Sequence, residues 1–401
     1  MNESDDILKS IRDGKITINK ISNETYDILI AGDFCPIGSF EQLCLNNQYQ
    51  DVFTDLLPIL SDKDLSIVNL ECPLAAETDP INKTGPNLIA DPQTVKMLDL
   101  GKFDVVTLAN NHILDQGRSG LVSTLDVCQR NGLKIVGAGI NIGNASKILD
   151  LEIKGNRVAI LNFTEHEFSI ASKDKAGANP LDPISNYYSI REAEKRADLV
   201  IVVIHGGNEH YPLPSPWLKK VFRYYADLGA DIVVGHHSHC TSGLEIYHGV
   251  PLIFGLGNFI FPWPDGDYQP WYEGMLVKFK VSQSILVEIE LIPYEQRRET
   301  PLVSLMKGKE KETFLGQIAS YSEIISDQQL LETEWNRFSR KRRKDYLGIL
   351  LSLNRLKRYL FKKGLYKVEK SKLNSLLNII RCESHNELAK KILENEINEK
   401  E

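Results

Sequence analysis

Short runs of apolar residues alternate with segments whose apolar residues recur three or four positions apart, from Tyr26 to about residue 293. Several runs are almost continuously apolar, which is typical of strands covered on both faces. The runs predict strands over Asp27–Ala31, Ser66–Leu70, Asp104–Ala109, Leu133–Val136, Val158–Phe163, Leu199–Ile204, Asp231–Val234 and Pro251–Leu256. The intervening segments predict helices over Thr94–Leu100, Gly120–Asn131, Ser189–Arg196 and Trp217–Leu228. The alternation predicts an α/β domain with a layered sheet core.

Two stretches of this region follow a different pattern. Met275–Val281 and Ile285–Ile292 alternate apolar and polar positions, which predicts an antiparallel hairpin that closes the domain. Residues 165–188 contain Gly, Pro, Asn and Ser without a clear period and predict a long loop. Structureless loops of that length are more often functional or mobile than incidental.

The pattern becomes helical after Thr300. Glu323–Arg337 and Tyr346–Phe361 place apolar residues three and four apart and predict two helices. We therefore expect an N-terminal segment over residues 1–25, one α/β domain over 26–300 and a basic helical C-terminal extension over 301–401.

Composition is that of an ordinary soluble globular protein, because 42% of the 401 residues are hydrophobic and 25% are charged. This balance excludes wholesale disorder, collagen and a coiled coil. The chain holds no run of about 18 apolar residues, so no transmembrane helix is expected. Met1–Lys20 lacks the basic start and apolar stretch of a secretory signal. We therefore expect a cytoplasmic protein whose six cysteines are free thiols.

The net charge of −7 is unevenly distributed. Residues 301–401 carry 21 basic and 14 acidic residues, against 26 and 40 in the rest of the chain. The excess is concentrated in Arg337–Lys372, with 14 basic and 2 acidic residues. This segment is either the solvated face of a helical appendage or a surface for membrane lipid or an anionic polymer. The acidic body argues against a nucleic-acid groove.

Polar clusters follow six of the predicted strands. Ligands of open α/β sheets bind beyond the carboxyl ends of the strands, so clusters at six such ends can converge on one place. They are Gly32-Asp33, Asn69-Leu70-Glu71, Asn110-Asn111-His112 with Asp115, His205-Gly206-Gly207-Asn208-Glu209, Gly235-His236-His237-Ser238-His239 and Gly257-Asn258-Phe259.

These residue types are oxygen and nitrogen donors suited to divalent metal ions. A His-x-His pair on an extended segment, here His237 and His239, directs both rings to one side. Each cluster also has a structural interpretation: a turn for Asp33, a helix start for Glu71 and a satisfied buried histidine for His205. Their joint occurrence at matching strand ends favours a metal or catalytic site, and the set contains enough ligands for two ions that share a carboxylate.

The ordered set of motifs over about residues 26–293 resembles the bacterial capsule-synthesis CapA family, also called poly-γ-glutamate biosynthesis proteins. That family is similar to the calcineurin-like metallophosphoesterases. The resemblance implies a four-layer αββα sandwich with one or two divalent ions, among which Mn, Fe, Zn and Mg are not distinguished.

The resemblance also implies roles for individual residues. His112 would protonate the leaving group, with Asp115 and Glu209 as groups that orient the site. One position departs from the superfamily pattern, because Cys35 stands where a histidine usually follows the first Asp by two residues. The implied metal ligands are Asp33, Glu71 as the bridging carboxylate, Asn111, His205, His237 and His239, with His236 as an additional donor.

The resulting hypothesis is a metal-dependent hydrolase of the phosphoesterase type in the biosynthesis or modification of a capsule or poly-γ-glutamate-type surface polymer. Its substrate would be an anionic polymer or a phosphoester. The basic tail would contact the membrane periphery or the capsule machinery. The alternative is a non-catalytic polymer-binding or assembly component of a capsule synthesis complex, motivated by the tail and by Cys35.

Overall fold

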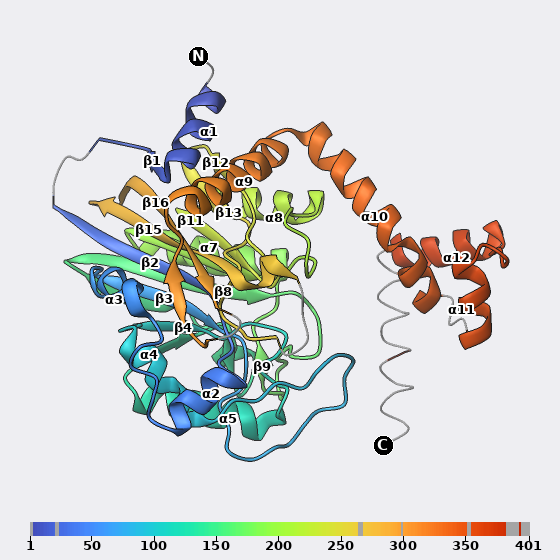
Figure 1. The fold of residues 1–401 in the computed structure, drawn as a ribbon, viewed down its shortest axis with the longest axis horizontal. Helices are drawn as coiled ribbons and strands as arrows, with labels where there is room; N and C mark the ends of the chain where they lie inside the picture. The colour runs from blue at the N-terminus through green and yellow to red at the C-terminus, as the bar shows by residue number, and fades with distance from the viewer. Residues whose placement is uncertain are drawn as a thin grey trace. The chain divides into compact units, whose positions relative to one another are not determined.

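The computed structural model describes residues 3–20, 24–263, 268–297, 300–350, 354–381 and 393, and is drawn in Figure 1. The chain forms two compact units, Met1–Glu332 and Thr333–Glu401. The first unit contains two large β-sheets, and the second is helical.

The first sheet has nine strands and combines a parallel half with an antiparallel half. Strands β2 to β5 run parallel, whereas β15 and β16 form the antiparallel hairpin beside β2. The hairpin confirms the alternating pattern in the sequence. In spatial order the strands are β1 (Lys15–Thr17), β16 (Ile285–Gln296), β15 (Glu273–Ser282), β2 (Thr25–Phe34), β3 (Leu65–Leu70), β4 (Val105–Thr107) and β5 (Lys134–Val136), with β14 (Asn258–Ile260) beside β2 and β17 (Val303–Leu305) beside β16.

The second sheet has six strands, of which the four central ones are parallel. A small two-stranded sheet joins β6 (Ala138–Gly139) to β9 (Gly177–Ala178). In spatial order the six strands are β12 (Leu244–Tyr247), β13 (Val250–Ile253), β11 (Ile232–His236), β10 (Leu199–His205), β8 (Asn156–Thr164) and β7 (Leu149–Ile153).

The two large sheets pack face to face, and helices cover their outer faces. Alternation along β2 sends Ile28 and Ile30 into the core between the sheets and Leu29 into the core beneath the helices. In β10, Ile201 points into the same inter-sheet core, whereas Val202 packs under helices of the opposite face. This arrangement is the four-layer αββα sandwich, which explains why the strands are apolar on both faces.

Several of the covering helices begin after a residue whose side chain caps the first turn. Ser215 accepts a hydrogen bond from the amide of Leu218 (3.1 Å), and Pro216 occupies the first turn of α8. The helices of the first unit are α1 (Glu3–Asp13), α2 (Ser39–Leu45), α3 (Leu57–Ser61), α4 (Lys96–Leu100), α5 (Gly117–Arg130), α6 (Ile142–Ala145), α7 (Pro183–Arg196), α8 (Pro216–Asp227) and α9 (Gly308–Ser326), with short 3₁₀ turns η1 (Thr54–Leu56), η2 (Pro92–Val95) and η3 (Gln269–Tyr272).

The expected loop over residues 165–188 is only partly a loop, because it contains β9 and the first six residues of α7. Asp182 accepts a hydrogen bond from the amide of Ile184 (3.1 Å), and Pro183 follows it in the first turn. The Asp-Pro pair is a helix-start signal that does not depend on the periodicity of apolar residues.

Helix α9 and strand β17 belong to the first unit, although the change of pattern predicts that the C-terminal extension begins at residue 301. Phe314 and Ile318 of α9 lie in the core between the sheets, and Ile325 packs beneath the other face of the second sheet. The change to helical periodicity at Thr300 therefore marks a change of secondary structure and not the edge of the compact unit.

The second unit contains most of α10 (Gln328–Leu350), together with α11 (Arg355–Lys362) and α12 (Lys370–Arg381). The two helices expected after Thr300 have other limits: Asp327 separates α9 from α10, and Asn354 caps α11. Residues 351–353, inside the second expected helix, lie outside the described part. A small cluster forms the core of this unit, and it consists of Phe361, Leu347, Tyr366, Val368, Leu373 and Leu376.

Two further expectations concern the cysteines and the membrane. The five cysteines in the described part, Cys35, Cys44, Cys72, Cys128 and Cys240, are free and buried. Among the described residues, no helix combines the length and the apolar character that crossing a bilayer requires.

Candidate metal centre

The polar ends of the central strands meet in one buried site. In the first sheet Asp33 is the register partner of Asn69 on one side and of Asn258 on the other. In the second sheet His205 and His236 are register partners at the ends of β10 and β11. Because the sheets pack face to face, these rows of polar residues face each other across the same end of the sandwich.

Three groups of side chains bring donor atoms within 4.8 Å of one another. Glu71, a buried carboxylate just after β3, belongs to two of them and therefore occupies the bridging position between them. The groups are Glu71 with His205 and His237, Asp33 with Glu71 and His239, and Glu209 with His237 and His239.

Asn111 and His236 add further donor atoms next to members of these groups. The side-chain oxygen of Asn111 lies 2.9 Å from Nε2 of His205, and Ser169 holds the Asn111 carbonyl with a hydrogen bond of 2.6 Å. Nδ1 of His236 lies 2.9 Å from Oδ1 of Asp33. All six residues implied as ligands, and His236, therefore lie in one buried cluster.

Glu71 is the electrostatic centre of the cluster. Among the described residues, neither oxygen of its fully buried carboxylate has a hydrogen-bond partner, and Nε2 of His205 and of His239 each lie 3.5 Å from Oε1. Burial raises the pKa of Glu71 well above its usual range, and the negative charges of Asp33 and Glu209 raise it further. A buried carboxylate with no compensating donor is costly unless it is paired with a cation, so the site fits divalent metal ions.

The protonation states of His205, His239 and Asp33 also suit a metal site. Burial lowers the pKa of His205 well below its usual range and that of His239 to about 4, so both imidazoles are neutral. Burial alone would raise the pKa of Asp33, but its close contact with His236 holds the pKa well below its usual range. Neutral imidazoles and ionised carboxylates are the forms that bind metal.

His237 and His239 do not lie on an extended segment, contrary to the expectation from the His-x-His pattern. Strand β11 ends at His236, and both residues have positive φ, 92° for His237 and 51° for His239. Positive φ is uncommon at non-glycine residues, although histidine adopts it more often than most, and such residues cluster at active sites and ligand-binding loops. The bends, rather than strand alternation, bring the two rings to 6.1 Å between centroids.

His112 stands beside this cluster with its own polar partners. Nδ1 of His112 is 2.6 Å from Oδ2 of Asp115, so the ring N–H donates to that carboxylate and leaves Nε2 for proton exchange. The side chain of Lys83 is only 3% exposed, and its ammonium donates to the other oxygen of Asp115 and lies 3.2 Å from Nδ1. Lys83 belongs to a loop after β3, and no pattern in the sequence singled it out.

Two asparagines of the quoted motifs, to which the sequence analysis assigned no role, hold the ligands in place. Asn69 donates to Oδ1 of Asp33 (2.8 Å) and lies 3.2 Å from Nδ1 of His205. Asn258 accepts from Nδ1 of His239 (2.9 Å), which turns Nε2 of that ring toward Glu71. Such partners fix the orientation of metal-binding imidazoles. Their place within the strand-end motifs was the available signal.

The third group is the most open, because Glu209 is exposed while its histidines are buried. Trp271 packs against the ring of His239, with 4.4 Å between centroids, and Trp263 packs against Trp271 at 5.0 Å. Glu165 accepts a hydrogen bond from the amide of Gly207 (3.1 Å), and burial raises its pKa.

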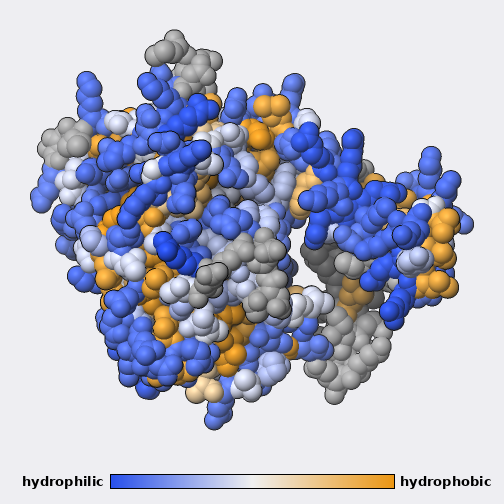
Figure 2. All heavy atoms as spheres, viewed as in Figure 1, coloured by the Kyte–Doolittle hydropathy of each residue, from blue (hydrophilic) through white to orange (hydrophobic). Residues whose placement is uncertain are grey.

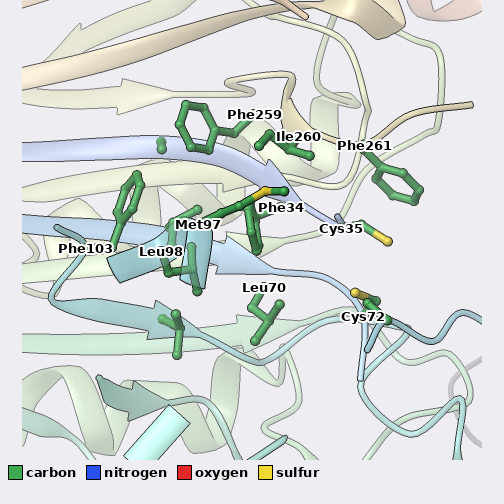
Figure 3. Close-up of a cluster of buried hydrophobic side chains, with 14 of the residues drawn as sticks. Phe34, Cys35, Leu70, Cys72, Met97, Leu98, Phe103, Phe259, Ile260 and Phe261 are labelled. Atoms are coloured by element: carbon green, nitrogen blue, oxygen red, sulfur yellow. The ribbon is translucent and has the colours of Figure 1, made fainter. Parts of the chain in front are cut away.

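Cys35 does not join the donor cluster. It follows β2, and Figure 3 shows its sulfur near that of Cys72, which lies just beyond β3. Burial and the hydrogen bond to Cys72 raise the pKa of Cys35 well above its usual range, so the thiol is neutral. Both cysteines belong to the hydrophobic cluster beneath the helices, drawn in Figure 3. Cys35 therefore packs in this cluster and belongs to none of the donor groups found among the described residues.

A family profile and individual relatives both place the chain among bacterial capsule synthesis proteins. Residues 27–263 match the profile of the family described as bacterial capsule synthesis protein PGA_cap. The PGA biosynthesis protein CapA of Bacillus subtilis is 30% identical over 72% of this chain and 77% of its own length. The capsule biosynthesis protein CapA of Bacillus anthracis is 30% identical over 70% of this chain and 69% of its own.

One solved structure resembles part of the chain at low sequence identity. It is the crystal structure of a hypothetical protein from Thermus thermophilus, with 14% identity and a TM-score of 0.43. The similarity covers 67% of this chain and 99% of that protein.

Proposed function

The chain belongs to the PGA_cap family of bacterial capsule synthesis proteins, and from this premise we propose that it is a metal-dependent hydrolase of the phosphoesterase type. Its substrate would be a phosphoester or an anionic polymer formed during capsule or poly-γ-glutamate biosynthesis. One observation carries the proposal: the buried carboxylate of Glu71 has no hydrogen-bond partner and is shared by two donor groups, one with His205 and His237 and the other with Asp33 and His239.

The residues that would hold the ions fall into two sets that share Glu71. Asn111, His205 and His237 surround one position, and Asp33 and His239 surround the other. When bound, divalent cations supply Lewis acidity and stabilise the negative charge that develops on a transferred phosphoryl group. His236 beside Asp33 supplements the second set, in which Cys35 takes no part.

The proton needed by the leaving group would come from His112. Its Nδ1–H bond to Asp115 fixes the ring orientation and stabilises the charged imidazolium, while Nε2 carries the proton to be transferred. Asp115 also accepts a hydrogen bond from the amide of Leu88 (2.7 Å), so the carboxylate itself is held in place. Buried Lys83 balances the charge of Asp115.

Replacing Lys83 with methionine is expected to lower kcat roughly tenfold with little change in KM, because Lys83 touches Asp115 rather than the open side of the site. Steady-state kinetics on a phosphodiester would measure the effect. Lys220→Met, at an exposed position of α8, is the matched control and should behave like the wild type. A change confined to KM would instead place Lys83 in substrate binding.

The direct test of the proposal combines metal content with turnover. The purified full-length chain, loaded with Mn²⁺, Fe²⁺, Zn²⁺ or Mg²⁺, should retain one or two ions after desalting and should hydrolyse a generic phosphodiester. Elemental analysis and release of nitrophenol measure the two properties separately. A chain that retains no metal and shows no hydrolysis with any of these ions contradicts the proposal.

The second candidate is a non-catalytic assembly or polymer-binding component, and Cys35 is the observation that favours it. A neutral thiol buried against Cys72 takes the place of a metal-binding histidine, which leaves one ion with fewer ligands. Metal retention without hydrolysis of phosphoesters or of poly-γ-glutamate would support this alternative over the hydrolase.

A further inference from the structure

Helix α11 of the second unit presents an apolar face that nothing in the described part of the chain covers. Leu356 and Tyr359 are one turn apart on this face and are 67% and 58% exposed. Phe361, two positions after Tyr359, lies on nearly the opposite side of the helix and is the residue that α11 buries in the core of the unit. The helix therefore turns one apolar residue inward and a larger apolar face outward.

The apolar face continues beyond the end of the helix. Gly364, with a φ of 77°, ends α11, and the amide of Leu365 donates to the carbonyl of Leu360 (2.9 Å) in a left-handed cap. This cap places Leu365 next to the last turn with 75% of its surface exposed. Figure 2 shows hydrophobic spheres among hydrophilic ones over the helices of this unit.

Positive charge surrounds the exposed apolar residues. Within residues 333–350 and 354–381 there are 15 basic and 3 acidic side chains. Arg355 lies next to Leu356 in α11, and the ammonium of Lys363 is 5.9 Å from the ring centroid of Tyr359. Arg342 stands in the same way over the exposed ring of Tyr346 in α10. Aromatic and aliphatic side chains therefore alternate with basic side chains along α11 and the residues that follow it.

We propose that this face, formed by Leu356, Tyr359 and Leu365 with the flanking Arg355 and Lys363, docks the protein on the surface of a bilayer that contains anionic lipid. A short basic amphipathic helix can bury its apolar face at the boundary of headgroups and acyl chains while its cations contact the lipid charges. Tyrosine suits this boundary because its ring is apolar and its hydroxyl is polar. The inference is independent of the metal centre.

The exposed leucines distinguish this partner from a soluble polyanion. A carboxylate polymer would neutralise the cations, but it offers no apolar phase in which Leu356 and Leu365 leave water. A lipid surface satisfies both features at once. The charge of the first unit, which carries the acidic excess, restricts the contact to the basic unit.

The test is co-sedimentation of the full-length protein with vesicles of phosphatidylcholine, alone or mixed with phosphatidylglycerol. Binding is expected only to the mixed vesicles and should weaken with added salt. The double variant Leu356→Ser/Tyr359→Ser should partition about tenfold less strongly, because both residues lose their apolar contact with the bilayer. Both sites are exposed, so the fold should be retained.

The matched control is Ile184→Ser/Tyr188→Ser in α7, which removes an aliphatic residue and a tyrosine of similar exposure, 76% and 69%, from the first unit. It should bind vesicles like the wild type. Failure of the wild type to bind anionic vesicles would overturn the proposal. Equal binding of both double variants, together with binding of soluble poly-γ-glutamate, would assign the face to an anionic polymer instead.

Discussion

Glu71→Gln is expected to abolish metal retention and to lower phosphoester hydrolysis roughly a thousandfold, equivalent to about 4 kcal/mol of transition-state stabilisation. Glutamine keeps the size of the side chain but removes the charge that the two donor groups share. Elemental analysis after desalting and steady-state kinetics would measure the two effects in the same preparation.

In the metal-free protein, by contrast, Glu71→Gln is expected to preserve or raise the thermal stability. Glu71 has a raised pKa in the folded state, so between its ordinary value of 4.5 and that raised pKa the folded chain binds more protons than the unfolded chain. Stability of the metal-free wild type therefore falls as the pH rises through this interval. Glu71→Gln lacks this loss, so at neutral pH the metal-free variant should unfold at an equal or higher temperature than the wild type.

Thermal unfolding with and without Mn²⁺ separates this prediction from simple misfolding. Added metal should raise the unfolding temperature of the wild type but not that of Glu71→Gln, because ligands stabilise only the state that binds them. Glu71→Asp, which keeps the charge on a shorter stem, should recover part of the metal binding. Equal metal content in Glu71→Gln and the wild type would remove Glu71 from the site.

His112→Ala is expected to lower kcat by about 10²–10⁴-fold, the usual contribution of a positioned general acid. The loss should depend on the leaving group. An alkyl phosphodiester needs a proton on its departing oxygen and should show nearly the full effect, whereas a nitrophenyl ester departs as a stable anion and should show little. Metal content should not change, because Nδ1 of His112 is held by Asp115 and the ring belongs to none of the donor groups.

His248→Ala is the control for the histidine variant, since His248 is an exposed residue beyond β12. It should leave the kinetics with both substrates unchanged. If His112→Ala slows the nitrophenyl ester as strongly as the alkyl ester, proton donation is not its role and the assignment of the general acid is wrong.

The strand pattern predicted the core well because a strand that is buried on both faces must be apolar at consecutive positions. In β2, Ile28 and Leu29 face different cores, yet both had to be apolar, and the continuous run follows from this. The same locality explains why the polar residues at the strand ends could be found. Asp33 lies at the carboxyl end of β2 and His205 at the carboxyl end of β10. Because each strand runs parallel to a neighbour, each residue lies at the edge of its sheet where the carboxyl ends of the parallel strands meet.

Features that depend on contacts between distant segments have no corresponding pattern in the sequence. Lys83 meets Asp115 across 32 residues of sequence through a loop without periodicity. Helix α9 follows a change of pattern, but only its packing on the sheets shows that it belongs to the first unit. Histidine adopts positive φ more often than most residues, but nothing in the local pattern shows that both His237 and His239 do so.

The sequence by itself determined the α/β class, the order of the principal strands, the identity of the donor residues at their ends and the family. Each of these follows from the order and the periodicity of residues that are close together in the sequence. Only the tertiary structure decided that Glu71 bridges two donor groups without a hydrogen bond, that Cys35 turns toward Cys72, and that the apolar face of α11 stays uncovered by the described residues. Those facts depend on how two sheets and separate helices pack, and packing brings together residues whose spacing along the chain carries no information about their contact.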